Sequence, residues 1–109
     1  MMESNISKAL NNFELEAGTI GDILIDGKLM VVANNNALSE EDFSNEYLSH
    51  VYKCIRNLYI TKQPVDIISV KNECDRLGLN LEMSYFTDLT KFSIGSNFEY
   101  KIKLVKELA

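Results

Sequence analysis

Apolar residues recur at intervals of three or four along most of the chain, which is the spacing of helices that bury one face. From Phe13 onward, these positions predict a first helix that ends at Asp26-Gly27, where the glycine offers a stop and a turn. A short second helix is predicted over residues 29–34. The Asn run that follows and the acidic segment 38–42 indicate a loop with helix-capping side chains.

The strongest periodicity predicts a helix over residues 44–61 that buries most of its circumference. Its apolar positions are Tyr47, Leu48, Val51, Tyr52, Cys54, Ile55, Leu58 and Tyr59. Pro64 disfavours helical geometry at the residue before it, and the carboxylate of Asp66 is placed to cap the next helix. That helix has one apolar stripe and ends at Gly78; the stripe consists of Ile67, Val70, Cys74 and Leu77.

Two more helices are predicted in the last third of the chain. The first is short and contains Tyr85, Phe86 and Leu89. After a break at Gly95, Ser96 or Asn97 can cap a final helix with two apolar stripes, Phe98, Ile102 and Val105 on one and Tyr100, Leu104 and Leu108 on the other. Because no alternating run of five or more residues predicts a strand, we expect an all-α fold, a compact orthogonal domain of about five or six helices.

Composition narrows the class of protein. A chain of 109 residues has room for one domain and one core, and 46% hydrophobic residues suffice to fold it. Its net charge of -5 would repel a phosphate backbone, so we expect no direct nucleic-acid binding. The sequence contains no secretory signal pattern and no apolar run long enough to span a bilayer, so we expect a cytoplasmic protein without a membrane partner.

The residues that could support catalysis or metal binding are few. The glycines are scattered and form no phosphate-binding loop, so neither ATP binding nor another cofactor is expected, and Gly18 and Gly21 instead indicate a close helix contact. His50 and Cys54 share a helix face, but even with Cys74 they supply three metal ligands where a structural zinc site needs about four. We therefore predict no metal site, no catalytic residues and buried, reduced cysteines.

Two charged segments have ordinary structural interpretations. The acids at 40–42 are adjacent and lack the spaced oxygens of a calcium loop, which favours a solvated, helix-capping role. Lys101, Lys103 and Lys106 form a modest basic patch on the final helix, interrupted by Glu99 and Glu107, and we expect a solvated face there.

Several segments in a fixed order resemble the N-terminal domain of DnaB-type replicative DNA helicases. The most specific is 63–70, Gln-Pro-Val-Asp-Ile-Ile-Ser-Val, which is similar to that family's proline, aliphatic, aspartate and aliphatic-pair sequence. Upstream, Asp42-Phe43 and the helix with His50-Val51-Tyr52 match in register, and residues 16–26 look like the family's first helix. Downstream, 85–89 resembles its Tyr-Leu-x-x-Leu segment, although the glycine pair and the proline of the family pattern are missing.

The resemblance implies a helical head followed by a two-helix hairpin through which subunits pair and build a collar on a hexameric, ATP-dependent helicase. It thus divides the chain into a globular head at 13–96 and the start of a hairpin helix at 97–109, and the mostly polar residues 1–12 are expected to form a flexible N-terminal lead. The final helix has no stop signal, which favours a piece of a longer protein. We expect the chain itself to be a monomer or a weak dimer, with candidate self-association residues Phe98, Ile102, Val105 and Leu108.

The leading functional hypothesis is a non-catalytic scaffold domain of a replicative helicase, whose partners are other helicase subunits, primase or a helicase loader. Two other binding functions stay open: a stand-alone phage-type mimic that captures host replication proteins, and the helicase-binding domain of primase, against which the segment 63–70 speaks. An enzyme would have to place His50, Cys54 and nearby carboxylates around a pocket.

Overall fold

The computed structural model describes residues 12–93 and 97–109. These residues form α-helices joined by short connections, and no strand occurs among them. In chain order the elements are α2 (Asn12–Ile25), α3 (Leu29–Asn35), the single 3-10 turn η1 (Glu40–Asp42), α4 (Glu46–Ile60), α5 (Ile67–Arg76), α6 (Met83–Thr90) and α7 (Phe98–Leu108). The predicted all-α class and the approximate position of every described helix are confirmed.

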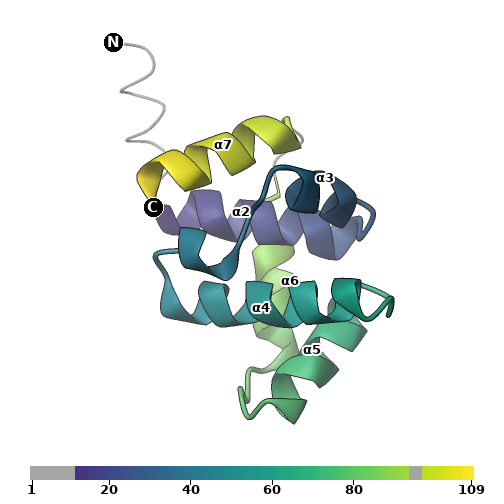
Figure 1. The fold of residues 1–109 in the computed structure, drawn as a ribbon. Coiled ribbons are helices and arrows are strands. Elements are labelled where there is room, and N and C mark those ends of the chain that lie inside the picture. Colours follow the sequence, from purple (N-terminus) through teal and green to yellow (C-terminus); the bar gives the residue numbers. More distant parts are fainter. Residues whose placement is uncertain (1–11, 94–96) are drawn as a thin grey trace.

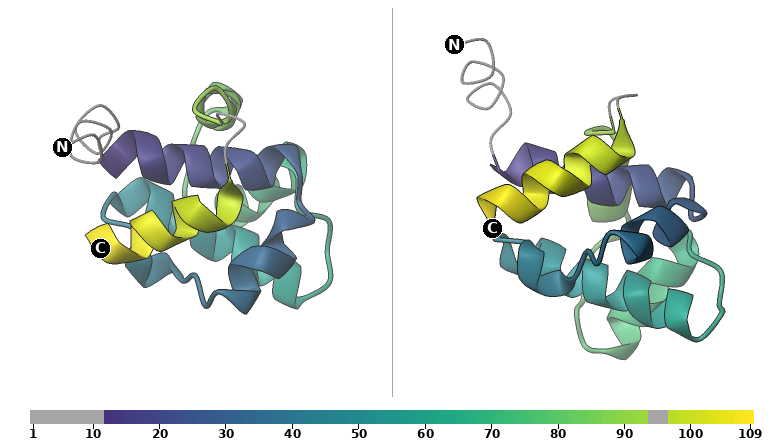
Figure 2. Two further views of the ribbon diagram at one scale, coloured as in Figure 1. Left: turned by 90° about the horizontal axis from the view of Figure 1, so that it is seen from above. Right: turned by 45° about the horizontal axis from the view of Figure 1, so that its top comes forward.

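The helices cross one another around α2. Figure 1 shows α2 between α7 and α4, with α6 crossing behind them and α5 below α4. The main contacts join α2 to α6 and α7, and α4 to α5. Figure 2 shows from two further directions that α7 runs back along α2, so that the end of α7 lies near the start of α2. The predicted lead at 1–12 falls outside the described residues apart from Asn12, and so does the predicted break at Gly95 and Ser96.

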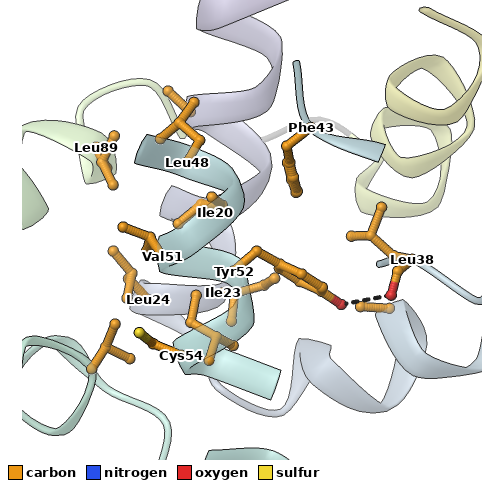
Figure 3. Packing of buried hydrophobic residues seen from close by; sticks show 14 of the residues in the cluster. Ile20, Ile23, Leu24, Leu38, Phe43, Leu48, Val51, Tyr52, Cys54 and Leu89 are labelled. Carbon is orange, nitrogen blue, oxygen red and sulfur yellow. Dashed lines mark hydrogen bonds between the residues drawn. The ribbon is translucent and has the colours of Figure 1, made fainter. Parts of the chain in front are cut away.

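One hydrophobic core joins the helices (Figure 3). Its largest fully buried side chain, Tyr52, packs on Phe43 with ring centroids 5.1 Å apart, and its hydroxyl donates to the Leu38 carbonyl at 3.1 Å. Burial raises the pKa of Tyr52 far above its ordinary value, so the phenol stays protonated and keeps this bond. The core thus holds the loop before η1 against α4.

Two glycines allow α6 to approach α2. A Cβ placed on Gly21 would lie 2.3 Å from the carbonyl oxygen of Leu89, and one on Gly18 would lie 2.7 Å from that of Phe92. Side chains at these positions would therefore push α6 away, and the predicted close helix contact is confirmed. Gly27 likewise allows a close approach, here of the loop before α5, since a Cβ at this position would lie 2.4 Å from the Val65 carbonyl oxygen.

Local capping explains where helices begin and end. The side-chain oxygens of Asn45, Asp66 and Asn97 accept the amide hydrogens of Leu48, Ser69 and Tyr100, at 3.0, 2.8 and 3.2 Å respectively. Gly78 follows the cap of α5, and its φ of +87° favours glycine. The amides of Gly78 and Leu79 donate back to the carbonyls of Asp75 and Cys74, at 3.0 and 2.8 Å, and close a Schellman motif.

Two residues assigned to the apolar stripes of the helices at 44–61 and 67–77 are not part of the core. Tyr47 is 55% exposed and Leu77 is 46% exposed. Tyr47 lies in the first turn of α4, where Leu48 faces inward in its place, and Leu77 lies beyond the last turn of α5. The apolar periodicity therefore predicted the buried face along most of each helix, but it wrongly assigned one terminal residue of each stripe to that face.

Candidate interaction surface

His50 and Cys54 share a cavity of about 310 Å³ that is also lined by Lys53, Leu77 and Leu79. His50 is exposed, and its Nε2 lies 3.9 Å from Glu46 Oε1, whereas Cys54 is only 2% exposed. The Cys54 thiol forms a hydrogen bond with Cys74 across the contact of α4 and α5, and that bond and burial raise the pKa of Cys74 far above its ordinary value. Both thiols are free and belong to the core, as predicted.

The arrangement of acidic and sulfur side chains does not form a metal site in the part of the chain that the structure describes. The acids at 40–42 instead support the fold. Asp42 Oδ2 accepts the Ser39 amide at 2.9 Å and the Lys106 ammonium at 3.1 Å, and Glu40 pairs with Arg56 at 3.2 Å. Of the three acids, only Glu41 is exposed to the extent that the sequence suggested.

The predicted solvated basic patch on the last helix is only partly correct, because Lys101 is buried and Lys106, although exposed, bonds to neighbouring segments. Lys101 is 7% exposed and its ammonium lies 2.8 Å from Asp22 Oδ2. Lys106 also donates to the Ala37 carbonyl at 3.0 Å, which ties α7 to the loop after α3. Lys103 is exposed and lines the outer side of α7.

Asp22 is the centre of a small buried network. Its Oδ1 accepts a short hydrogen bond from the Ser93 hydroxyl, and its Oδ2 accepts from Lys101. One carboxylate on α2 therefore holds both α7 and the chain that follows α6. The sequence contained a signal for this pair, since Asp22 and Lys101 are charges of opposite sign on otherwise apolar helix faces.

Glu16 is a second buried acid that the sequence reasoning missed. Its Oε2 accepts the amide and the hydroxyl of Ser44, at 2.9 and 2.7 Å, and its Oε1 accepts the amide of Asn45 at 3.1 Å. Negative charge is favourable near a helix N-terminus, where backbone amides lack partners. Glu16 thus fixes the start of α4 against α2.

Three of the four candidate self-association residues are buried in this fold. Phe98, Ile102 and Val105 are 8%, 1% and 1% exposed and contribute to the core, whereas Leu108 is 46% exposed. They were assigned to pairing because the resemblance places pairing in a hairpin that begins with this helix, and in the structure Phe98, Ile102 and Val105 cover α2. The outer stripe, Tyr100, Leu104 and Leu108, remains at or near the surface.

Next to the outer stripe lies a cavity of about 780 Å³, between α7 and the end of α3. Tyr100, Lys103, Lys106 and Asn36 line it, together with Glu99 and Glu107. Because cationic and anionic side chains alternate along its wall, it favours no ligand charge.

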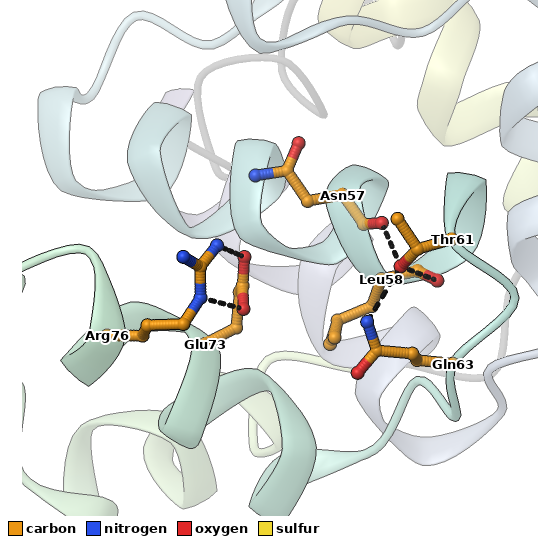
Figure 4. Close-up of polar contacts among 6 residues, drawn as sticks. All are labelled: Asn57, Leu58, Thr61, Gln63, Glu73 and Arg76. Atoms are coloured by element: carbon orange, nitrogen blue, oxygen red, sulfur yellow. Dashed lines mark hydrogen bonds and ion pairs between the residues drawn. The ribbon is translucent and has the colours of Figure 1, made fainter.

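Figure 4 shows polar contacts within α5 and at the end of α4, on the outer side of these two helices. Arg76 donates from Nε and Nη2 to the two carboxylate oxygens of Glu73, at 2.9 and 2.7 Å. This bidentate hydrogen bond is the main reason that the pKa of Glu73 is lowered and that of Arg76 is raised, and a hydrogen bond from Asn57 lowers the pKa of Glu73 further. Beside this pair is a cavity of about 360 Å³, lined also by Ile60, Thr61 and Gln63.

Comparison with protein families assigns the fold. The model of the DnaB-like helicase N-terminal domain matches residues 8–107, which is nearly the whole chain. The chain belongs to the DnaB-like helicase N-terminal domain family. The resemblance seen at 16–26, 42–58, 63–70 and 85–89 is thereby confirmed as family membership.

A solved structure agrees with this family assignment. The N-terminal domain of DnaB helicase from Mycobacterium tuberculosis matches with a TM-score of 0.79 and 25% identity, over 87% of this chain and 70% of that one. No curated protein is significantly similar in sequence. The match is to the helicase, not to the helicase-binding domain of primase that the sequence left open. Among the described residues of this DnaB-like domain, no helix is long and apolar enough to cross a membrane.

Proposed function

We propose that this DnaB-like domain is a non-catalytic scaffold of a replicative DNA helicase, which acts in the cytoplasm by joining helicase subunits in a collar and by contacting primase or a helicase loader. The observation that carries the proposal is the family match across residues 8–107. The parent protein is then an ATP-dependent helicase, and this domain contributes contacts to it rather than chemistry.

The distribution of polar groups supports a binding function. The buried charged side chains described, Glu16, Asp22 and Lys101, all form hydrogen bonds that hold helices together. Since α7 buries Phe98, Ile102 and Val105 internally, pairing between subunits through this helix would use its outer stripe, including Tyr100 and Leu108. Firm pairing then requires a second, antiparallel helix beside α7, because stable interfaces bury upwards of ~1,200 Å² in total.

Binding and ATPase measurements on the purified chain test this function. We expect no ATP turnover above that of a mock preparation, and saturable binding to fluorescently labelled primase helicase-binding domain or to a purified helicase loader, followed by anisotropy. A dissociation constant in the micromolar range, about -8 kcal/mol, is typical of a weak scaffold contact. ATP turnover that survives rigorous purification, or no binding to either protein or to DnaB subunits, would refute the proposal.

A further inference from the structure

Two separate cavities lie on the outer side of the contact between α4 and α5, and together they are here called the α4–α5 groove. One is lined by His50, Lys53 and Leu77, and the other by Ile60 and Arg76. On α4, positions 50, 53, 57 and 60 follow one another at helical spacing. Arg76 at the end of α5 is followed directly by Leu77. The two cavities therefore follow one another along a single outer face, part of which is seen in Figure 4.

The walls of the α4–α5 groove combine aliphatic and cationic side chains. Ile60 is 62% exposed at one end and Leu77 is 46% exposed at the other. Lys53 is exposed between them, and the side chain of Arg76 is 66% exposed although it pairs with Glu73. The side chain of Glu73 is only 10% exposed. Lys53 and Arg76 therefore face solvent, while the carboxylate that pairs with Arg76 lies deeper.

The charge of this region contrasts with that of the rest of the chain. Residues 46–76 contain five Lys or Arg and four Asp or Glu, whereas the remaining residues contain six and twelve. The α4–α5 groove thus lies on a segment of net positive charge in an acidic protein. Such a surface attracts a partner of negative charge.

We propose that the α4–α5 groove binds an acidic amphipathic helix of a partner protein. A furrow between two helices accepts the side-chain ridge of a third, whose apolar residues at i, i+3, i+4 and i+7 would contact Leu77 and Ile60. Carboxylates flanking that stripe would meet Lys53 and Arg76. This proposal rests on the proposed function, because it names the kind of segment through which a replication partner would dock.

The chemistry favours a protein helix over the other anionic occupant, a nucleic acid. Phosphate backbones are bound by several cations in a row, and the aliphatic ends of the groove offer them nothing. Exposed aliphatic side chains that flank an Arg are instead typical of protein interfaces, in which apolar anchors are surrounded by charge.

The probe is a synthetic helical peptide of about 18 residues, five turns, with Leu on one face and Glu on its flanks. Amide chemical shifts of the full chain would be followed as this peptide is added. We expect the perturbed amides to cluster around Lys53, Ile60 and Leu77, and the affinity to fall with salt. A peptide of the same composition in scrambled order, and one with Lys in place of Glu, should bind at least about tenfold more weakly.

Two surface variants and two matched controls test the site. Lys53→Glu and Ile60→Asp should each weaken binding of the peptide about tenfold or more, whereas Lys91→Glu on the end of α6 and Val31→Asp on α3 should not change it. All four side chains are exposed, so thermal unfolding should show that the variants fold, and Lys53→Ala provides a milder replacement if a charge reversal does not.

Several outcomes would overturn the proposal: shifts on another face, equal binding of the scrambled peptide, or variants that bind normally. A double-stranded oligonucleotide that perturbs the same amides would reassign the groove to nucleic acid, and concentration-dependent shifts without peptide would reassign it to a second copy. Failure of the proposed function is distinguishable. If primase or loader binds equally well to Lys53→Glu and to the unmodified chain, the groove proposal fails and the function stands; if neither protein binds while the peptide does, the reverse holds.

Discussion

The contacts of α2 with α7 and of α4 with α5 place their charges in opposite ways. Between α2 and α7, the pair of Asp22 and Lys101 lies inside, with each side chain only 9% exposed. At the contact of α4 with α5, Val70 and Cys74 are fully buried, and the pair of Glu73 and Arg76, both on α5, lies at the rim, where solvent reaches Arg76. The first contact depends on a charge pair for its geometry, and the second depends on apolar packing.

This difference has an energetic consequence. A buried pair is often no more stabilising than well-packed apolar residues, yet removing one partner leaves the other charge buried and uncompensated. A rim pair loses little when it is broken, because water replaces the missing partner. The two contacts should therefore respond differently to the loss of one charge, and four substitutions test this in order of expected size.

Removal of the buried cation should have the largest effect. Lys101→Met leaves the carboxylate of Asp22 without its ammonium partner, so the free energy of unfolding should fall by about 3–5 kcal/mol, measured by urea denaturation. The double variant Asp22→Leu with Lys101→Met is the control, and it should recover much of that loss because no charge remains buried. A loss under about 1 kcal/mol for the single variant would show that the pair is not central to the contact.

Truncation of the core at the α4–α5 contact should come next. Leu58 is 3% exposed and Val70 is fully buried, so Leu58→Ala and Val70→Ala should cost about 2–4 and 1–3 kcal/mol in unfolding experiments. The control is Ile68→Ala, since Ile68 is 66% exposed on the same helix as Val70 and should change stability by no more than ~0.5 kcal/mol. Similar losses at all three positions would contradict the described helix phasing.

Loss of the cap on α5 should be smaller. Asp66→Ala removes the acceptor of the Ser69 amide and should destabilise the fold by about 1 kcal/mol. Asp88→Ala on α6, where the carboxylate is exposed beside Lys91, is the matched control and should cost less than ~0.5 kcal/mol. If calorimetry gives equal melting temperatures for both variants, Asp66 does not contribute as a cap.

The rim pair should give the smallest effect, and acid should reveal it. Because Arg76 lowers the pKa of Glu73 in the folded state, their pairing stabilises the fold above the ordinary pKa of a glutamate and is lost as the pH falls through the lowered value. Arg76→Gln should therefore flatten part of the decline in stability on acidification and change little at neutral pH. The same urea midpoints for both proteins at every pH would mean that the pair does not contribute.

Sequence alone predicted the helices because their apolar stripes and caps are local signals. Asp66, Gly78 and Asn97 act through hydrogen bonds to residues a few positions away, so their spacing carries the information. The close contact at Gly21 could be inferred from residue type, although its partner at Leu89 could not.

The buried polar contacts between helices were harder to predict because they join distant segments of the chain. Asp22 and Lys101 are 79 positions apart, and Glu16 reaches Ser44 across 28, so the sequence showed charges on apolar faces without their partners. The family resemblance placed the start of a pairing surface on α7, at Phe98, Ile102, Val105 and Leu108, and the sequence did not show that the first three cover α2. Which of two stripes a helix buries is decided by the helix that it meets, here α2.

Sedimentation equilibrium of the full 109-residue chain, over micromolar to millimolar concentration, tests most directly whether α7 completes the domain's own core. With Phe98, Ile102 and Val105 buried against α2, the chain should remain near its monomer mass of 12.4 kDa or associate only weakly. A version extended by a second helix antiparallel to α7 should form firm dimers. A tight dimer of the 109-residue chain at micromolar concentration would contradict this account, because the pairing surface would then lie on the head itself.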